Sequence, residues 1–134
     1  MTRRLDIAAV CFLDSSGALL TVRKRDTKAF MLPGGKLEPN ESPRAAAVRE
    51  AVEELGIRED AVRLELLGRW GADAANEADT TVDAHVFVST DSIAPTASSE
   101  IEEIRWISLS DSVEKLRLAP LLVECVIPAL RARA

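Results

Sequence analysis

GKLEPNESPRAAAVREAVEELGI, residues 35–57, is the most informative stretch of this 134-residue chain. Its second half is rich in helix-forming residues and has a signal at each end. Ser42 is a suitable N-cap, and Pro43 is tolerated at the first helical position. Gly56 can take the left-handed conformation that ends a helix. The sequence therefore predicts a helix over residues 43–55.

Three carboxylates lie on one side of this helix. At about 100° per residue, Glu50, Glu53 and Glu54 fall within an arc of about 100°. The opposite side is apolar and predicted to face the core, with Val48, Val52 and Leu55 flanked by Ala45 and Ala51. Neighbouring carboxylates repel one another, so the cluster lowers stability unless a cation neutralises it. Such oxygen ligands suit Mg²⁺ or Mn²⁺. The helix alone leaves open a solvated acidic face instead.

A longer pattern surrounds the helix. The spacing is G-x5-E-x7-R-E-A-x-E-E-x-G-I, formed by Gly35, Glu41, Arg49, Glu50, Glu53, Glu54, Gly56 and Ile57. It closely resembles the signature of the Nudix (MutT-like) hydrolases, G-x5-E-x7-R-E-U-x-E-E-x-G-U, in which U is a bulky aliphatic residue. The one departure is Ala51, which is predicted to face the core and so bears on packing rather than chemistry.

This resemblance implies an α/β fold and a reaction. The fold is the Nudix fold, an α/β/α sandwich around a mixed sheet, with residues 1–134 as a single Nudix hydrolase domain and the box at 35–57. The reaction is hydrolysis of a nucleoside diphosphate linked to a group X, with Mg²⁺ or Mn²⁺ as cofactor. Carried over by position, the metal ligands are Gly35, Glu50, Glu53 and Glu54. Glu53 and Glu54 also count as catalytic, together with Arg49, which orients the carboxylates.

The general base and the substrate contacts lie outside the box. In this family the base often comes from a later loop, and Glu100, Glu102 and Glu103 are candidates. We rank Glu100 first, because it ends the polar loop 89–99, whereas Glu103 belongs to a predicted strand. Arg23 stands where similar proteins place a phosphate-binding arginine, with a solvated loop charge as the alternative. Phe30 could stack on a nucleobase or pack into the core.

The rest of the chain predicts strands interleaved with helices. Strands are expected over 5–13, 18–22, 62–70, 81–88 and 103–107, the first two joined as a hairpin by the turn 14–17. A short helix capped by Ser110 and an apolar helix over 120–131, bent at Pro128, follow. The last helix could pack on its own sheet or on a partner subunit, so the chain could be a monomer or a homodimer.

Composition excludes several classes of function. The net charge of −5, the absence of Tyr and an aromatic content of 4% argue against stable nucleic-acid binding. The apolar runs are too short for a membrane span. Cys11 and Cys125 lie in apolar runs, as expected of reduced core thiols in a cytoplasmic protein.

The partner that these observations predict is a small nucleotide. A length of 134 residues leaves little beyond the core fold, which favours a (deoxy)nucleoside triphosphate, intact or oxidised, cleaved to monophosphate and pyrophosphate. A hydrolase of ADP-ribose, nucleotide sugars or dinucleoside polyphosphates is the alternative within the enzyme class. A catalytically silent domain that only binds a nucleotide is the alternative outside it.

Overall fold

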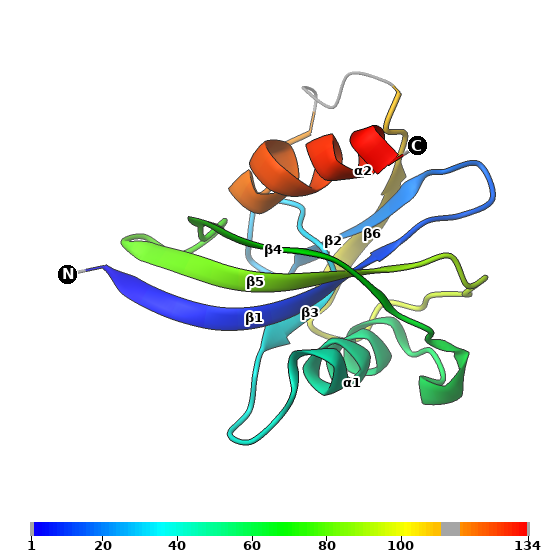
Figure 1. Cartoon of the computed structure of the whole chain (residues 1–134), viewed down its shortest axis with the longest axis horizontal. Helices are drawn as coiled ribbons and strands as arrows, with labels where there is room; N and C mark the ends of the chain where they lie inside the picture. The colour runs from blue at the N-terminus through cyan, green and yellow to red at the C-terminus, as the bar shows by residue number, and fades with distance from the viewer. Residues whose placement is uncertain (1, 111–115, 134) are drawn as a thin grey trace.

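The computed structural model describes residues 2–110 and 116–133, and it places two helices on opposite sides of a strand layer (Figure 1). A four-stranded sheet has the order β3-β1-β5-β4. A two-stranded sheet is made by β2 and β6. The strands are β1 (Arg3–Phe12), β2 (Leu19–Lys24), β3 (Gly34–Lys36), β4 (Glu65–Asp73), β5 (Thr80–Ser89) and β6 (Ile101–Ile107).

The larger sheet is mixed, as predicted. The central strand β1 runs parallel to β5 and antiparallel to β3, and β4 runs antiparallel to β5. Residues of β1 from Ala8 to Phe12 are buried on both faces. Ala8, Val10 and Phe12 pack on the side of helix α1 (Pro43–Leu55), and Ala9 and Cys11 on the side of helix α2 (Ile127–Arg133). The continuous apolar run at this position is typical of a strand covered on both faces.

The predicted hairpin between the first two strands is wrong in its pairing. The turn forms, with Gly17 N–H donating to the Asp14 carbonyl at 2.9 Å. The two strands then share only the bridge between Leu13 and Leu19, and β2 pairs with β6 instead. Both edges of β1 are occupied by β3 and β5, so β2 must find its partner elsewhere.

Several boundaries also differ from prediction. Strand β3 (Gly34–Lys36) forms where no strand was predicted. Strand β4 is displaced toward the C-terminus and begins at Glu65; a 3₁₀ turn over Glu59–Ala61 (η1) ends just before the predicted start at residue 62. Strand β6 begins earlier than predicted, at Ile101. The predicted short helix after Ser110 lies outside the described residues.

Helix α1 has the predicted limits but a different buried face. Ser42 Oγ accepts from Ala45 N–H at 3.1 Å, and Gly56 ends the helix with a φ of 62°. The buried residues are Ala46, Ala47, Ala51, Glu54 and Leu55, whereas Val48 and Val52 are half-buried. The predicted core face is therefore confirmed for Ala51 and Leu55 and wrong for Val48, Val52 and the exposed Ala45. Small alanines allow the helix to approach the sheet closely, and this arrangement turns Glu54 inward.

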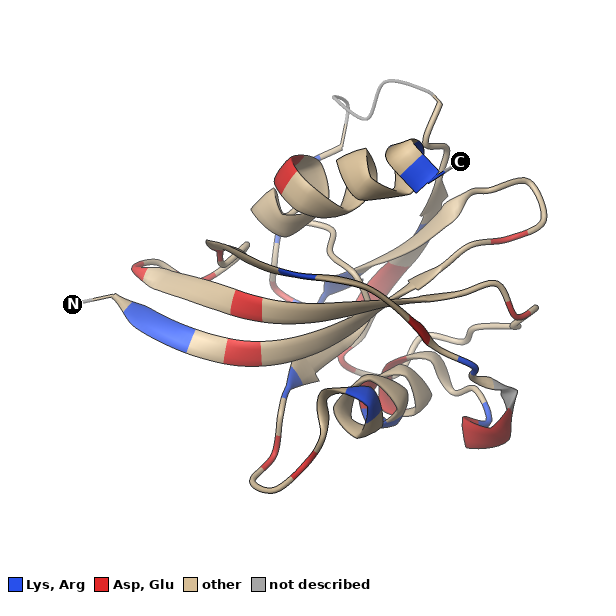
Figure 2. Ribbon diagram, in the orientation of Figure 1, with Lys and Arg blue, Asp and Glu red and all other residues tan. Residues whose placement is uncertain are grey.

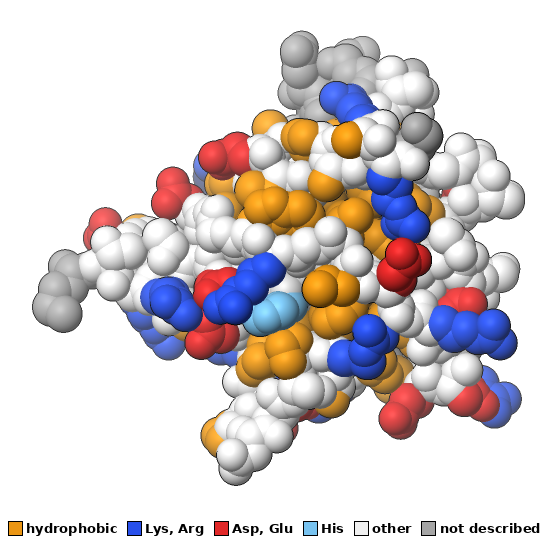
Figure 3. Space-filling model, viewed as in Figure 1, with side chains coloured by type: hydrophobic (Ala, Val, Ile, Leu, Met, Phe, Trp, Pro, Cys, Tyr) orange, Lys and Arg blue, Asp and Glu red, His pale blue; other side chains and the backbone are white. Residues whose placement is uncertain are grey.

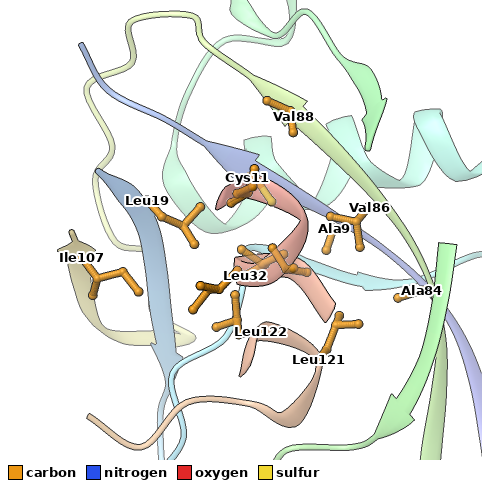
Figure 4. Packing of buried hydrophobic residues seen from close by; sticks show 13 residues of the cluster. Ala9, Cys11, Leu19, Leu32, Ala84, Val86, Val88, Ile107, Leu121 and Leu122 are labelled. Atoms are coloured by element: carbon orange, nitrogen blue, oxygen red, sulfur yellow. The ribbon is translucent and has the colours of Figure 1, made fainter. Parts of the chain in front are cut away.

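The apolar C-terminal helix contains a π-helical turn, η2 (Leu122–Val126), before α2. Ile127 N–H donates to the Leu122 carbonyl, five residues back, immediately before Pro128, which has no N–H. The discontinuity predicted at Pro128 thus takes the form of a π turn. Figure 4 shows Leu121 and Leu122 beside Leu32 in the core cluster, so the helix packs on its own sheet.

Cys11, Cys125 and His85 lie away from the carboxylate helix. Both cysteines are free thiols; Cys11 is buried, and this burial raises the pKa of its thiol. His85 of β5 lies opposite Arg69 of β4, which forms an ion pair with Asp83 at 2.7 Å; the only histidine of the chain is pale blue in Figure 3, beside apolar and charged side chains. Within the described ranges, no helix is long and apolar enough to cross a membrane.

Candidate active site

A pocket of about 520 Å³ has a charged end and an apolar wall. Its charged end contains Lys24 from β2, Glu50 and Glu53 from α1, and Glu100 from the loop before β6, next to the backbone of β3. Its apolar wall is formed by Leu5, Ile7, Met31, Leu32, Val82, Leu121 and Leu122. The π turn and the central strand therefore meet the carboxylate helix at one concave surface.

Glu54 reaches this end from the buried face of α1. Its side chain is 2% exposed, and its Oε1 accepts from Gly34 N–H at 2.9 Å. Its Oε2 is buried and has no hydrogen-bond partner in the described part of the chain; Lys24 Nζ lies 3.7 Å away. Burial raises the pKa of Glu54 to about 7, against the opposing effects of Lys24 and the Gly34 N–H. The negative charges of Glu50 and Glu100, which line the same end of the pocket, raise this pKa further.

Arg49 connects the loop before α1 to the carboxylate cluster. Its guanidinium donates to both Glu41 oxygens, at 2.8 and 2.9 Å, to Glu50 Oε1 at 2.8 Å and to the Lys36 carbonyl at 3.1 Å. These contacts raise the pKa of Arg49 and lower that of Glu41 to about 2. Acidic residues in the loop before α1 are drawn red in Figure 2. The 59% exposed Glu53 lies 3.6 Å from Arg49, so Arg49 is close to both helix carboxylates that line the pocket.

Gly35 leaves the space that the Glu50 carboxylate fills. A Cβ at position 35 would lie 2.6 Å from Glu50 Cδ and 2.7 Å from its Oε1. These distances are too short for any real Cβ contact. Strand β3, which pairs with β1, thus brings its bare backbone against the carboxylates of α1.

Of the three candidates for the general base, Glu100 is the one that lines the pocket. Glu102 pairs with Arg25 at 2.7 Å, and Glu103 pairs with Arg105 at 2.6 Å. The ladder between β2 and β6 slips by one residue here, because Arg23 opposes Glu103 while Lys24 opposes Ile101. Such a bulge re-aims side chains next to it.

Two predicted substrate contacts lie elsewhere. Arg23 donates to the Thr27 carbonyl at 2.9 Å, and its guanidinium lies 5.9 Å from the ring centre of Phe30. Phe30 is 6% exposed, and neither residue lines the pocket. Lys24, the neighbour of Arg23, lies there instead. Both residues belong to β2, and adjacent strand residues point to opposite faces, so only one of the pair faces the site.

The donor set fits a divalent cation. In residues 2–110 and 116–133, no three His, Cys, Asp or Glu side chains are already gathered as a ligand set. The unpartnered Glu54 Oε2 is nevertheless a buried carboxyl oxygen beside the pocket, and carboxylate oxygens are the ligands that hard cations prefer. Glu50, Glu53, Glu54 and the backbone of Gly35 are the groups that could hold such an ion.

The family model of the NUDIX domain matches residues 2–126, and the chain therefore belongs to the NUDIX family. The resemblance and the Nudix fold predicted from residues 35–57 are confirmed. Members of this family generally use divalent metal ions, which agrees with the oxygen donors at the pocket.

Relatives and solved structures agree with this assignment. The "Putative 8-oxo-dGTP diphosphatase" of Bacillus subtilis is 45% identical over 49 residues, which are 37% of this chain and 33% of that protein. The CMP-5'-(N-acetyl-N-hydroxy-3-aminopropyl)phosphonate hydrolase of Streptomyces rubellomurinus is 33% identical over 93 residues, 69% of this chain and 44% of that protein. The matched segments thus span less than half of either relative. The MutT protein from Methanosarcina mazei Go1 has the same fold, with a TM-score of 0.76, 20% identity, and coverage of 98% and 96% of the two chains.

Proposed function

We propose that this protein is an Mg²⁺-dependent (or Mn²⁺-dependent) pyrophosphohydrolase of nucleoside triphosphates, intact or oxidised. It cleaves them to a monophosphate and pyrophosphate. The observation that carries the proposal is the pocket, which joins a cluster of carboxylates to an apolar wall. The carboxylates suit a cation-bridged polyphosphate, and the wall suits a nucleobase.

The residues along the pocket have different roles in this proposal. Glu50, Glu53 and Glu54 hold the cation, which when bound offsets the charge of the phosphates and makes water more acidic. Glu100 takes the proton of the attacking water. Arg49 keeps the Glu50 carboxylate facing β3 through the 2.8 Å hydrogen bond. Lys24 offers its ammonium group to phosphate oxygens at the same end.

The apolar wall supports a free nucleotide as the substrate. None of the described residues that line the pocket is aromatic, so the base contacts aliphatic side chains and Met31. The name of the Bacillus subtilis relative states 8-oxo-dGTP as its substrate. An oxidised purine nucleotide is therefore the first compound to test.

A second candidate is a hydrolase of substrates with a larger group X. A neighbouring depression of about 420 Å³ shares Thr27, Ala75, Asn76 and Glu77 with the pocket and adds Asp26, Lys28, Ala78 and Arg117. Its two cations could contact an anionic group beyond the cleaved linkage. The Streptomyces rubellomurinus relative is named for a CMP-linked phosphonate, which also carries a large group on the nucleotide.

The test is a pooled panel of nucleotides incubated with protein and Mg²⁺ or Mn²⁺, with every product identified by mass spectrometry. The panel contains natural and oxidised triphosphates, ADP-ribose, nucleotide sugars and dinucleoside polyphosphates. Glu54→Gln provides the blank. Glu65→Gln removes an exposed carboxylate that pairs only loosely with Arg133, at 3.6 Å, and is the matched control.

Each outcome separates the candidates. The main proposal is supported if wild type and Glu65→Gln convert a triphosphate to equal yields of monophosphate and pyrophosphate and Glu54→Gln does not. Two phosphorylated halves without pyrophosphate support the second candidate. Nucleotide binding without turnover of any compound contradicts both and supports a silent binding domain.

A further inference from the structure

The loop that presents Glu100 is fastened to helix α1 on one side. Ser98 N–H donates to the carbonyl of Glu54 at 3.0 Å, and Thr96 N–H donates to the carbonyl of Leu55 at 2.8 Å. Ile101 N–H then donates to the Ser98 carbonyl at 3.0 Å. The last turn of a helix has carbonyls without partners inside the helix, and here the loop uses two of them. The backbone before Glu100 is thereby tied to the residue that carries the buried carboxylate.

A single residue, Arg25, fastens the same loop on the other side. Its backbone N–H donates to the Glu100 carbonyl at 2.8 Å. Its Nε donates to the Ser99 carbonyl at 3.0 Å, and its Nη1 lies 2.7 Å from Glu102 Oε2. Because the bulge leaves Glu102 without an opposite residue on β2, this carboxylate is available to Arg25. Arg25 thus contacts Ser99 and Glu102, on either side of Glu100, and also the backbone carbonyl of Glu100.

We propose that Arg25 is a positioning residue that holds Glu100 at the pocket. This inference rests on the proposed function, in which Glu100 takes the proton of the attacking water. Arg25 does not line the pocket, so it acts through the backbone of residues 99–102. A displacement of about 1 Å of a reacting group can lower a rate about 100-fold. The backbone bond to Glu100 survives removal of the guanidinium, so we expect a smaller loss, about tenfold in kcat.

The contribution of Arg25 to stability is expected to be small. Its side chain is 57% exposed and that of Glu102 is 40% exposed, and exposed ion pairs contribute little to stability. Arg25→Ala should therefore fold normally. Arg58→Ala is the matched control, because Arg58 is also exposed and hydrogen-bonds Asp60, two residues along the chain.

The experiment is a double-mutant cycle of Arg25→Ala and Glu100→Gln, measured with the triphosphate that the panel identifies. We expect Arg25→Ala to lower kcat about tenfold with KM and the half-saturating Mg²⁺ concentration within about twofold. In the Glu100→Gln background, the same substitution should lower kcat no further, because the residue through which Arg25 acts is already disabled. Arg58→Ala should leave all these constants unchanged.

A second readout needs no substrate or metal. Amide hydrogen exchange of residues 98–101 should be faster in Arg25→Ala than in wild type or Arg58→Ala, with the unfolding midpoint unchanged. The inference would be overturned if Arg25→Ala lowered kcat equally in the wild-type and Glu100→Gln backgrounds. It would also be overturned if Arg25→Ala kept the wild-type kcat while Glu100→Gln was impaired. A wild-type kcat for Glu100→Gln itself would instead show that the proposed general base is wrong, and the positioning role would fail with it.

Discussion

Gly35→Ala tests whether the position of the Glu50 carboxylate matters for catalysis. The new methyl group would lie 2.6 Å from Glu50 Cδ, and an ordinary van der Waals contact begins at 3.4 Å. The carboxyl group must therefore move by about 0.8 Å. It is the end of a flexible side chain, so the movement is easy, but it strains the 2.8 Å hydrogen bond from Arg49.

The expected effect on activity is much larger than the effect on folding. Mg²⁺ demands near-ideal octahedral geometry with ligands at about 2.0–2.1 Å, so a ligand displaced by most of an ångström is lost or badly oriented. We expect kcat/KM to fall about 100-fold and the half-saturating Mg²⁺ concentration to rise about tenfold. The free energy of unfolding should change by less than about 1 kcal/mol, because replacing Gly by Ala also restricts the unfolded chain.

Two other glycines provide controls for this substitution. At Gly71, a Cβ would meet only the Val82 carbonyl oxygen, at an ordinary 3.7 Å, so Gly71→Ala should preserve both activity and stability. At Gly34, a Cβ would meet the backbone of Ala8 and Ala9, which cannot turn aside. Gly34→Ala should therefore destabilise the protein by about 3 kcal/mol, as overpacking does. Urea unfolding and Mg²⁺ titrations of turnover check all three variants.

One result would refute this reasoning. If Gly35→Ala folds normally and keeps kcat/KM and the Mg²⁺ dependence of wild type within about threefold, then the position of Glu50 is irrelevant to the reaction. The assignment of Glu50 as a metal ligand would then be withdrawn.

Three further substitutions have distinct expected outcomes. The pKa of Glu54 is raised from 4.5 to about 7 in the folded protein, so the stability that its protonated form provides is complete below pH 4.5 and is lost as the pH rises through 7. In urea unfolding without metal, the free energy of unfolding of wild type should therefore fall by roughly 3 kcal/mol relative to that of Glu54→Gln between pH 4.5 and 8. Arg49→Lys should lower kcat at least about tenfold in steady-state assays, because an ammonium cannot replace the guanidinium fork. Lys24→Met should raise KM for the triphosphate about tenfold while Lys28→Met does not, measured by product release.

The limits of the box helix were predictable because its end signals are local. Ser42 and Gly56 act on the backbone within a few residues, and the helix begins and ends beside them. The choice of buried face was not local. The sequence pattern placed Val48 and Val52 in the core, but close packing against β1 selected the alanines and drew Glu54 inside. A hydrophobicity pattern ranks side chains by polarity and does not register how closely two elements can approach.

The pairing of the strands and the position of the β-bulge likewise could not be predicted from the sequence. A strand pattern shows that residues 18–22 are extended, but the partner of that strand depends on which edges of β1 are free. The slip between Arg23 and Lys24 leaves Glu102 as an extra residue on β6, two residues after Glu100. The residues on β2 carry no trace of this bulge.

The buried end of the pocket links the stability of the protein to its function. Glu54 Oε2 lies inside the protein without a hydrogen bond, and the neighbouring Lys24 ammonium, at 3.7 Å, only partly offsets the loss of hydration. A divalent cation held by Glu50, Glu53 and Glu54 would supply the positive charge that this buried carboxyl lacks. The Lys24 ammonium lies at the end of the pocket where the phosphates are proposed to bind. The one glutamate on a buried helix face that is otherwise alanine and leucine thus couples the stability of the protein to cation binding at the pocket.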